Sequence, residues 1–349
     1  LPVHAGLIRS SSADPAGNLV MAEEAVIGEV LQIAQAVHYC GGTVFAHVKR
    51  LIDSPHAPQH VRVPGILVDL IVVADEQDHH QTFAEQLNPS YFTASTGESL
   101  VPATDGTEPS LARLLIAARA CDELHAGDIA NLGIGMPEGI AREAARRGIF
   151  RDFTLTIESG PIGGVPAGGL SFGASSFPDA VIDQPALFDF YDGGGLDFAA
   201  LGAAEVDRHG NVNVSQFGRA VAGVGGFVNI SQNAGRLVFC GTMTSGGLQL
   251  ALRNGELRIV NEGQRHKFVE DVRQISFSGE LARSQQRDVL FVTERAVFRL
   301  IPEGLELIEV APGIDLESQI LGVMDFQPLI NNVRPIRQEI QQSVADLLM

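Results

Sequence analysis

The segment TIESGPIGGVPAGG, Thr156 to Gly169, has the features that decide how the fold and function of the rest of the chain are interpreted. Thr154 to Ile157 is apolar and β-branched, which predicts a short buried strand. This strand delivers the carboxylate of Glu158 onto a turn rich in glycine, and glycines let a backbone approach a ligand and point N–H groups at it. A carboxylate at a strand end that faces free amides suits a covalent reaction at a carbonyl. The alternative is a glycine-rich turn whose glutamate is merely solvated. The glycines concerned are Gly160, Gly163, Gly164, Gly168, Gly169 and Gly173.

A second glycine turn precedes the first one. Residues 128–147, DIANLGIGMPEGIAREAARR, predict a strand, a glycine loop and a helix. The loop falls where a helix N-terminus favours an anion, and close packing of helix on strand is its structural alternative. Gly135 comes 158 − 135 = 23 residues before Glu158, as expected for neighbouring strands of an α/β unit. The candidate ligand-binding residues of this loop are Gly133, Ile134, Gly135, Met136 and Pro137.

Two further loops are candidates for the same site. The sequence from Asp189 to Gly195, DFYDGGG, predicts a turn that could close over a pocket. The sequence GVGGF contributes Gly223, Gly225 and Gly226 and is flanked by apolar residues typical of strands. An ordinary tight turn is the alternative for either loop.

Four segments together resemble the family I coenzyme A transferases, and the likeness is greatest to the single-chain acetate/propionate (short-chain acyl) CoA-transferases. These segments are Thr156–Gly169, Ile182–Asp197, Val206–Gly218 and Ala220–Ala234. The resemblance runs from about Pro2 to about Leu329, excluding Thr93 to Ser110. It implies that Glu158 forms a glutamyl-CoA thioester. It also implies that the loop with Gly223, Gly225 and Gly226 contacts CoA, with a backbone amide facing the thioester carbonyl.

The resemblance implies reversible ping-pong transfer of CoA from a short-chain acyl-CoA to a carboxylic acid of acetate, propionate or 3-oxoacid type. CoA and acyl-CoA would be substrates, and neither a cofactor nor a metal is needed. Two alternatives stay open. Water attacking the thioester would give an acyl-CoA hydrolase, and a truncated chain could be a non-catalytic partner subunit.

An internal repeat predicts the organisation of the chain. SADPAGNLV, from Ser12, matches EVDRHGNVN, from Glu205, so that Asp14 aligns with Asp207 at an offset of 207 − 14 = 193. Both contain Asp-x-x-Gly-Asn, a turn signal. At the same offset, Val44 falls on Leu237 in a second apolar strand. We therefore predict an α/β fold with two repeated CoA-transferase-type subdomains. The first would be incomplete, because the counterparts of Gly127 to Asp192 would precede Leu1.

The predicted domains follow from this repeat. Residues 1–92 would form the C-terminal part of the first subdomain, 93–110 a linker, 111–330 the second subdomain with Glu158, and 331–349 a tail. Helices are expected at Met21–Gly42, stopped by its two terminal glycines, at 111–125 and at 336–348. Strands are expected at 43–48 and 66–73.

Composition limits the class of protein. The chain has 349 residues, 45% of them hydrophobic, and a formal charge of −18, which argues against nucleic acid and anionic membrane surfaces as partners. No run of about 18 apolar residues predicts a membrane span, and the start shows no signal-peptide pattern. The cysteines, Cys40, Cys121 and Cys240, lack CxxC spacing, so we expect them to be reduced and buried in a cytoplasmic protein. We also expect a homo-oligomer.

Overall fold

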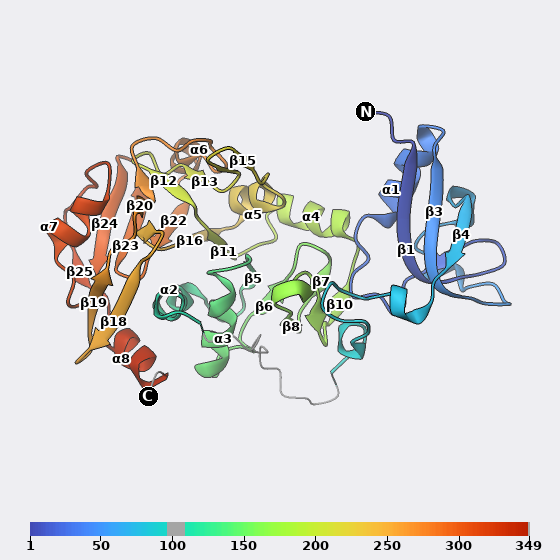
Figure 1. Ribbon diagram of the computed structural model, residues 1–349, viewed down its shortest axis with the longest axis horizontal. Helices are drawn as coiled ribbons and strands as arrows, with labels where there is room; N and C mark the ends of the chain where they lie inside the picture. Colours follow the sequence, from blue (N-terminus) through green and yellow to red (C-terminus); the bar gives the residue numbers. More distant parts are fainter. Residues whose placement is uncertain (96–108, 348–349) are drawn as a thin grey trace. The chain divides into compact units, whose positions relative to one another are not determined.

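The computed structural model describes residues 1–95 and 109–347 and forms two compact units (Figure 1). The first unit contains Leu1–Asp105 and Leu155–Asp189, and the second contains Gly106–Thr154 and Phe190–Met349. The segment around Glu158 therefore belongs to the first unit, although the sequence places it inside the predicted second subdomain. Most of the predicted linker, residues 96–108, lies outside the described residues.

The first unit is built on a four-stranded sheet in the order β2-β1-β3-β4. Its strands are β1 (Ala5–Ala13), β2 (Leu19–Val20), β3 (Thr43–Leu51) and β4 (Leu70–Val73). β3 runs parallel to both β1 and β4. Helix α1 (Val30–Tyr39) packs on one face, where Ala34 and Val37 join the alternate strand residues Ile8, Val44 and Ala46 in a buried core. Period-two burial along β3 agrees with a sheet covered by a helix on that face.

Two predictions for this sheet were too long. The helix expected over Met21–Gly42 begins only at Val30, because the preceding residues turn back toward the sheet. There Glu24 accepts hydrogen bonds from Arg9 at 2.6 Å and Ser11 at 3.1 Å. The helix ends at the predicted glycines, with Gly41 at φ 69°. The strand expected over 66–73 begins at Leu70, after a 3₁₀ turn at Gly65–Leu67.

The remainder of the first unit consists of short antiparallel pairs. β6 (Thr154–Thr156), which begins one residue before this unit, pairs with β7 (Pro161–Ile162), and β7 pairs with β10 (Ala180–Val181). Between them β8 (Val165–Pro166) pairs with β9 (Ser175–Ser176). The predicted strand before Glu158 is thus confirmed.

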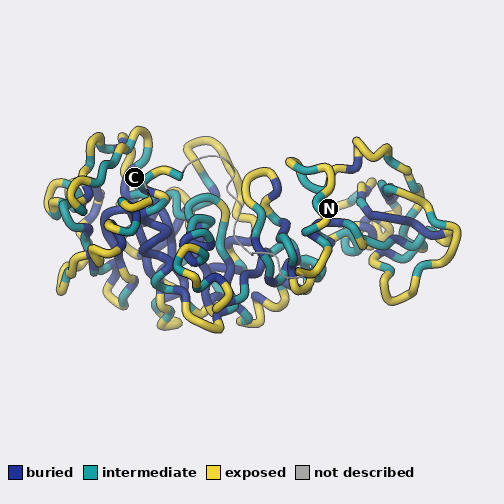
Figure 2. Tube along the Cα trace, turned by 90° about the horizontal axis from the view of Figure 1, so that it is seen from below, coloured by how far each residue is buried: buried dark blue, intermediate teal, exposed yellow. Residues whose placement is uncertain are grey.

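The second unit contains a larger sheet whose order runs β5-β11-β16-β22-β23-β24-β25. β5, β11, β16 and β22 are parallel, and β23 and β24 continue the sheet antiparallel. The central strands β11, β16 and β22 are almost entirely buried, the class drawn dark blue in Figure 2, because both faces of this part of the sheet are covered. Phe239 and Phe291 stack inside it with ring centroids 5.3 Å apart. The strands are β5 (Ile129–Leu132), β11 (Phe198–Gly202), β16 (Arg236–Cys240), β22 (Asp288–Val292), β23 (Ala296–Ile301), β24 (Gly304–Val310) and β25 (Arg334–Pro335).

Helices and small ribbons complete this unit. Helix α2 is capped by Ser110, whose hydroxyl accepts from the amide of Arg113. It packs on α3 and on α8, so the predicted tail at 331–349 is joined to the second unit through α8 and β25. The helices are α2 (Leu111–Ala120), α3 (Glu138–Arg146), α5 (Phe227–Asn233), α6 (Gly279–Ser284), α7 (Leu316–Gln319) and α8 (Gln338–Leu347), and α4 (Gln184–Asp192) crosses between the units in sequence. The ribbons are β12 (Glu205–Asp207), β13 (Val212–Asn213), β14 (Gln216–Phe217), β15 (Ala220–Val221), β17 (Thr244–Ser245), β18 (Gln249–Arg253), β19 (Glu256–Asn261), β20 (Arg265–His266) and β21 (Phe268–Val269).

The repeated motifs have the same local structure in both units. Strands β1 and β3 pair with Ala5 opposite Thr43, and β11 and β16 pair with Phe198 opposite Arg236, so both partners differ by the predicted offset of 193. The turns also match. One carboxylate oxygen of Asp14 accepts from the amides of residues 16 and 18, and one of Asp207 accepts from those of residues 209 and 211. The predicted repeat is therefore confirmed at the level of strands and turns.

One prediction about the cysteines was wrong. Cys121 and Cys240 are buried, as expected, but Cys40 is exposed. It is the C-cap of α1, beyond the last buried residue of that helix, so its side chain has no core to enter. All three cysteines are free thiols.

Candidate functional site

Glu158 stands in a tight turn at the end of β6. The amide of Ile157 donates to Pro161 O at 3.0 Å, and the amide of Gly160 donates to Ile157 O at 2.8 Å. These bonds close the chain around Glu158 and Ser159, and the Ser159 hydroxyl donates to Gly173 O. The backbone beneath the carboxylate is therefore fixed from both sides, as a reacting group requires.

The Glu158 side chain is half-buried and has no hydrogen-bond or ion-pair partner within residues 1–95 and 109–347. Burial raises its pKa above the usual value, because desolvation disfavours the charged form. By contrast, the half-buried carboxylate of Glu23 in this unit is paired with Lys49 at 3.1 Å and with Arg50. A poorly solvated carboxylate without a cation is suited to act as a nucleophile.

The glycines after Glu158 have two roles, and one differs from the expectation. An ideal Cβ at Gly160 would lie 2.0 Å from Ile182 O, and one at Gly164 would lie 2.4 Å from Ser176 O. Both have positive φ, so close protein packing explains them without a ligand. At Gly168 and Gly169, by contrast, the space for a Cβ is open. The open space at this pair is compatible with the predicted close approach of a ligand, although the positive φ of Gly169 by itself also favours glycine.

The loop Gly133–Pro137 connects β5 to α3 in the second unit, as the sequence predicts. The amide of Gly133 donates to Ala200 O at 2.9 Å, which anchors the loop to β11. The amides of Ile134 and Gly135 donate to no acceptor in the described part of the chain, and the Ile134 side chain is exposed. Pro137 precedes the first helical residue, Glu138. The loop thus presents free N–H groups at a helix N-terminus.

The second glycine loop, Gly223–Gly226, also lies in the second unit. Its amide at Gly223 donates to Ser215 O at 3.3 Å, whereas those of Gly225 and Gly226 find no acceptor among the residues that the structure describes. We expected strand-like residues on both sides of this loop, and the structure confirms this only for the side that precedes it. β15 precedes the loop, but α5 follows it, because Phe227 and Ile230 repeat at helical spacing and are buried.

The segment Asp189–Gly195 is not the predicted turn over a pocket. Helix α4 extends to Asp192, and only the glycines after it form a turn. The Asp192 carboxylate accepts from the side-chain amides of Asn229 and Asn233 at 2.9 Å and 3.1 Å. These bonds hold the end of α4 to α5, so the segment has a packing role.

The predicted site residues are divided between the units. Glu158 belongs to the first unit, and both glycine loops belong to the second. Sequence reasoning missed one further candidate, Lys267, whose side chain lines a cavity in the second unit. The sequence did offer one signal, the rarity of lysine: only two of its 24 lysine and arginine residues are lysines, so each could have been singled out. No group of three or more His, Cys, Asp and Glu placed to hold a metal ion occurs within residues 1–95 and 109–347.

Comparisons with known proteins place this architecture among CoA-transferases. The chain is 42% identical over 325 residues to acetate CoA-transferase YdiF of Escherichia coli K12, covering 93% of this chain and 60% of that protein. It is 30% identical over 219 residues to acetate CoA-transferase subunit beta of E. coli K12, covering 59% of this chain and 89% of that subunit. A crystal structure of YdiF from E. coli O157:H7, described as a thioester complex with CoA, superimposes with a TM-score of 0.87 at 38% identity. That match covers 97% of this chain and 63% of the YdiF chain. No family model matches the sequence.

The α/β fold, with its carboxylate-bearing turn and paired glycine loops, defines a protein of the CoA-transferase class. At these identities the chain belongs to the family I coenzyme A transferases. It spans about 60% of the length of the YdiF protein that it matches. No helix among the described residues is long and apolar enough to cross a membrane.

Proposed function

We propose that this protein transfers CoA from a short-chain acyl-CoA to a carboxylic acid, with Glu158 as the nucleophile. The observation that carries the proposal is the half-buried Glu158 carboxylate, fixed in its turn and without a partner in the described residues. The relatives named for acetate CoA transfer support the reaction type. Acceptors of acetate, propionate or 3-oxoacid type fit this chemistry.

In the proposed reaction, a Glu158 oxygen attacks the acyl carbonyl carbon of acyl-CoA, and the C–S bond breaks. The products are a mixed anhydride and the CoA thiolate. The thiolate then attacks the glutamyl carbonyl carbon, forming the glutamyl-CoA thioester and releasing the first acid as its carboxylate. A second carboxylate reverses these steps and leaves as its CoA ester. Each step conserves the energy of the thioester, so neither a metal nor a further cofactor is required.

Glycine amides are the proposed donors to the oxyanion that forms in each attack. The free amides of Gly225 and Gly226 support this role, and those of Ile134 and Gly135 support binding of an anionic part of CoA. One well-placed oxyanion donor contributes roughly 3 kcal/mol to the transition state. We assign Gly133, Met136, Pro137 and Gly223 to the same CoA-binding loops.

Mass spectrometry of the Glu158 peptide tests the proposal. Incubation with acetyl-CoA should add one CoA, borohydride should reduce the thioester to an alcohol, and hydroxylamine should convert it to a hydroxamate. Glu158→Gln should abolish both the adduct and transfer to propionate, and Glu158→Asp should lose about 100-fold because the carboxylate falls about 1 Å short. Glu76→Gln, at an exposed residue of the same unit, is the control and should behave as wild type.

The outcomes separate the alternatives. Normal transfer by Glu158→Gln, or an adduct elsewhere, would overturn the assignment. Release of free CoA without an acceptor acid would favour an acyl-CoA hydrolase. Absence of any adduct on the wild-type chain would favour a non-catalytic partner subunit.

We also propose that the protein is cytoplasmic and forms a homo-oligomer. Three free cysteines are consistent with a reducing compartment. Light scattering on the purified chain measures its oligomeric state, and a monomeric mass at working concentration would contradict the second part of this proposal.

A further inference from the structure

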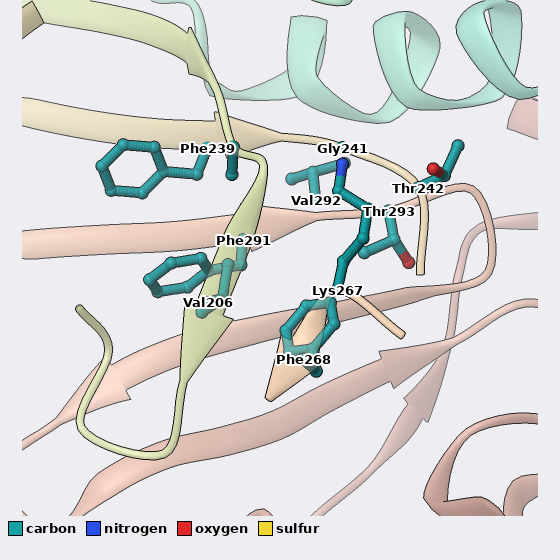
Figure 3. A pocket seen from close by; sticks show the side chains of 10 residues that line it. Val206, Phe239, Gly241, Thr242, Lys267, Phe268, Phe291, Val292 and Thr293 are labelled. Atoms are coloured by element: carbon teal, nitrogen blue, oxygen red, sulfur yellow. The ribbon is translucent and has the colours of Figure 1, made fainter. Parts of the chain in front are cut away.

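A cavity in the second unit opens at the carboxyl ends of three parallel strands (Figure 3). It lies beyond the last residues of β11, β16 and β22, the position where open α/β sheets bind ligands. The cavity measures about 10 Å³, room for roughly one water molecule. Its lining is mostly apolar, and it consists of Ala203, Val206, Phe239, Gly241, Thr242, Lys267, Phe268, Phe291, Val292 and Thr293.

Lys267 is the one charged residue of that lining, and its main chain is fixed. Its amide donates to Met243 O at 3.2 Å, and its carbonyl accepts from the amide of Val206 at 2.8 Å. The side chain crosses Gly241, where an ideal Cβ would lie 2.8 Å from Nζ (Figure 3). The missing side chain at Gly241 therefore leaves the space that the ammonium group occupies.

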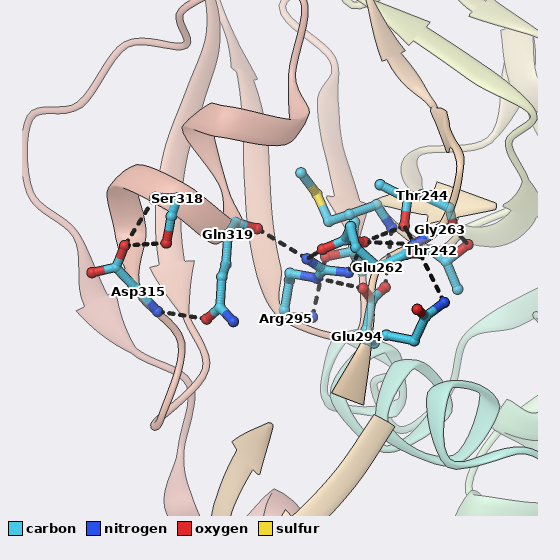
Figure 4. A network of polar contacts seen from close by, with 12 residues as sticks. Thr242, Thr244, Glu262, Gly263, Glu294, Arg295, Asp315, Ser318 and Gln319 are labelled. Carbon is cyan, nitrogen blue, oxygen red and sulfur yellow. Dashed lines mark hydrogen bonds and ion pairs between the residues drawn. The ribbon is translucent and has the colours of Figure 1, made fainter. Parts of the chain in front are cut away.

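The Lys267 Nζ atom has no hydrogen-bond or ion-pair partner within the described ranges, 1–95 and 109–347. The acid whose charge acts on it, Glu294, is already engaged, as Figure 4 shows. Glu294 accepts from Arg295 Nε at 2.6 Å and from the amide of Met243 at 3.1 Å. Burial lowers the pKa of Lys267, and the charge of Glu294 offsets this only in part. A larger share of this amine is thus neutral than is usual for lysine, and a neutral amine is nucleophilic.

The other lysine of the chain provides a contrast. Lys49 Nζ lies 3.1 Å from a carboxylate oxygen of Glu23 in an ion pair. Its amine must give up this partner before it can react. The remaining basic residues, apart from histidine, are arginines. An arginine does not react with thioesters at neutral pH, because its guanidinium group stays protonated.

We propose that Lys267 is an acylation site of this protein, at which the amine reacts with short-chain acyl-CoA in preference to Lys49. The proposal rests on the proposed function only in that acyl-CoA is the reagent this protein meets. The Nζ lone pair attacks the thioester carbonyl carbon, the C–N bond forms and the C–S bond breaks. CoA leaves as the thiol after taking the proton lost from nitrogen. The product is an amide that carries no charge and persists when a glutamyl thioester would be cleaved.

The test is peptide mass spectrometry of the full 349-residue chain incubated with acetyl-CoA. Hydroxylamine treatment first removes any thioester, so only amides are counted. Acetylation of Lys267 should clearly exceed that of Lys49, because the Lys267 amine has no ion-pair partner in the described residues and burial lowers its pKa, whereas Lys49 is held by Glu23.

Two variants make the result specific. In Glu158→Gln, acetylation of Lys267 should persist, so a failed CoA-transferase proposal would leave this one standing. In Glu23→Gln, which removes the ion pair of Lys49, acetylation of Lys49 should rise while Lys267 is unchanged. Equal or faster acetylation of Lys49 in the wild-type chain, or loss of the Lys267 modification in Glu158→Gln, would overturn direct acylation.

Discussion

Charged side chains without partners stand out at the residue scale because most buried charges here are paired. Arg119 is held by Glu309 at 2.7 Å, and the fully buried Arg295 is held by Glu294 and Glu262. Removing water from a charge is costly unless another charge or a hydrogen bond replaces it. Glu158 and Lys267 depart from that rule within the described residues, which is why both proposals of reactivity fall on them.

The raised pKa of Glu158 also predicts how stability depends on pH. Because burial raises the folded-state pKa, the group favours the folded state in acid and loses that contribution as pH rises through the folded pKa. At neutral pH, Glu158→Gln should therefore be slightly more stable than wild type. The gain should be at most about 1 kcal/mol, since the carboxylate is only half-buried.

Urea unfolding at several pH values measures this difference. The advantage of Glu158→Gln should shrink as pH falls toward 4.5, the ordinary pKa of a glutamate, because the wild-type side chain then becomes neutral as well. A difference that stays constant across this range would contradict the burial of an unpaired carboxylate. If Glu158→Gln forms no CoA adduct but unfolds in urea at least as late as wild type, its defect is catalytic and does not come from loss of folding.

At the scale of elements, the repeated turns depend on a matched pair of glycines. An ideal Cβ at Gly65 would lie 2.0 Å from Ala16 O, and one at Gly279 would lie 2.1 Å from His209 O. The two acceptors are equivalent in the repeat, since 209 − 16 = 193. The amides of both glycines donate to the turn asparagines, Asn18 and Asn211, at 2.9 Å.

We expect Gly65→Ala and Gly279→Ala each to cost about 2–3 kcal/mol of stability, because the added methyl group must displace backbone. Urea denaturation of purified variants measures the cost. Gly202→Ala is the matched control, since it has open space and no positive φ, and it should change stability by less than about 1 kcal/mol. A neutral effect at Gly65 alongside a large one at Gly279 would show that the repeat is not energetically equivalent.

Sequence reasoning succeeded where local chemistry determines the element. Asp-x-x-Gly-Asn specifies its turn through bonds within five residues, so the repeat was predictable from two short strings. It failed over Met21–Glu29, where helical spacing was overridden by tertiary contacts from Glu24 to Arg9. The turn predicted at Asp189–Gly195 failed likewise, because partners on α5, more than 35 residues later, stabilise the end of α4.

At the scale of the whole molecule, the first unit is assembled from two distant chain segments. The amide of Phe177 donates to Ser90 O at 2.6 Å, and that of Gln184 donates to Gly28 O at 3.1 Å. Ala174 also packs with Ala25 and Tyr91. These contacts join residues far apart in sequence, which a reading of local composition cannot detect. The domain boundaries predicted from the sequence describe the internal repeat, and they stay a prediction. The two compact units are defined instead by contacts in space, which join segments that are distant in the sequence.

This assembly makes a prediction about limited proteolysis. The composition of Thr93–Ser110, rich in Ser, Thr, Gly and Pro, leads us to expect the first cut there. The two fragments should nevertheless stay together, because the first unit needs Leu155–Asp189 from the later fragment. Size-exclusion chromatography should show one peak at the elution volume of the uncut protein, and a denaturing gel of that peak should show both fragments. Addition of urea before chromatography is the control and should separate them. Fragments that elute apart without denaturant would mean that residues before the cut fold independently, and first cleavage inside Gly127–Gly241 would contradict the linker itself.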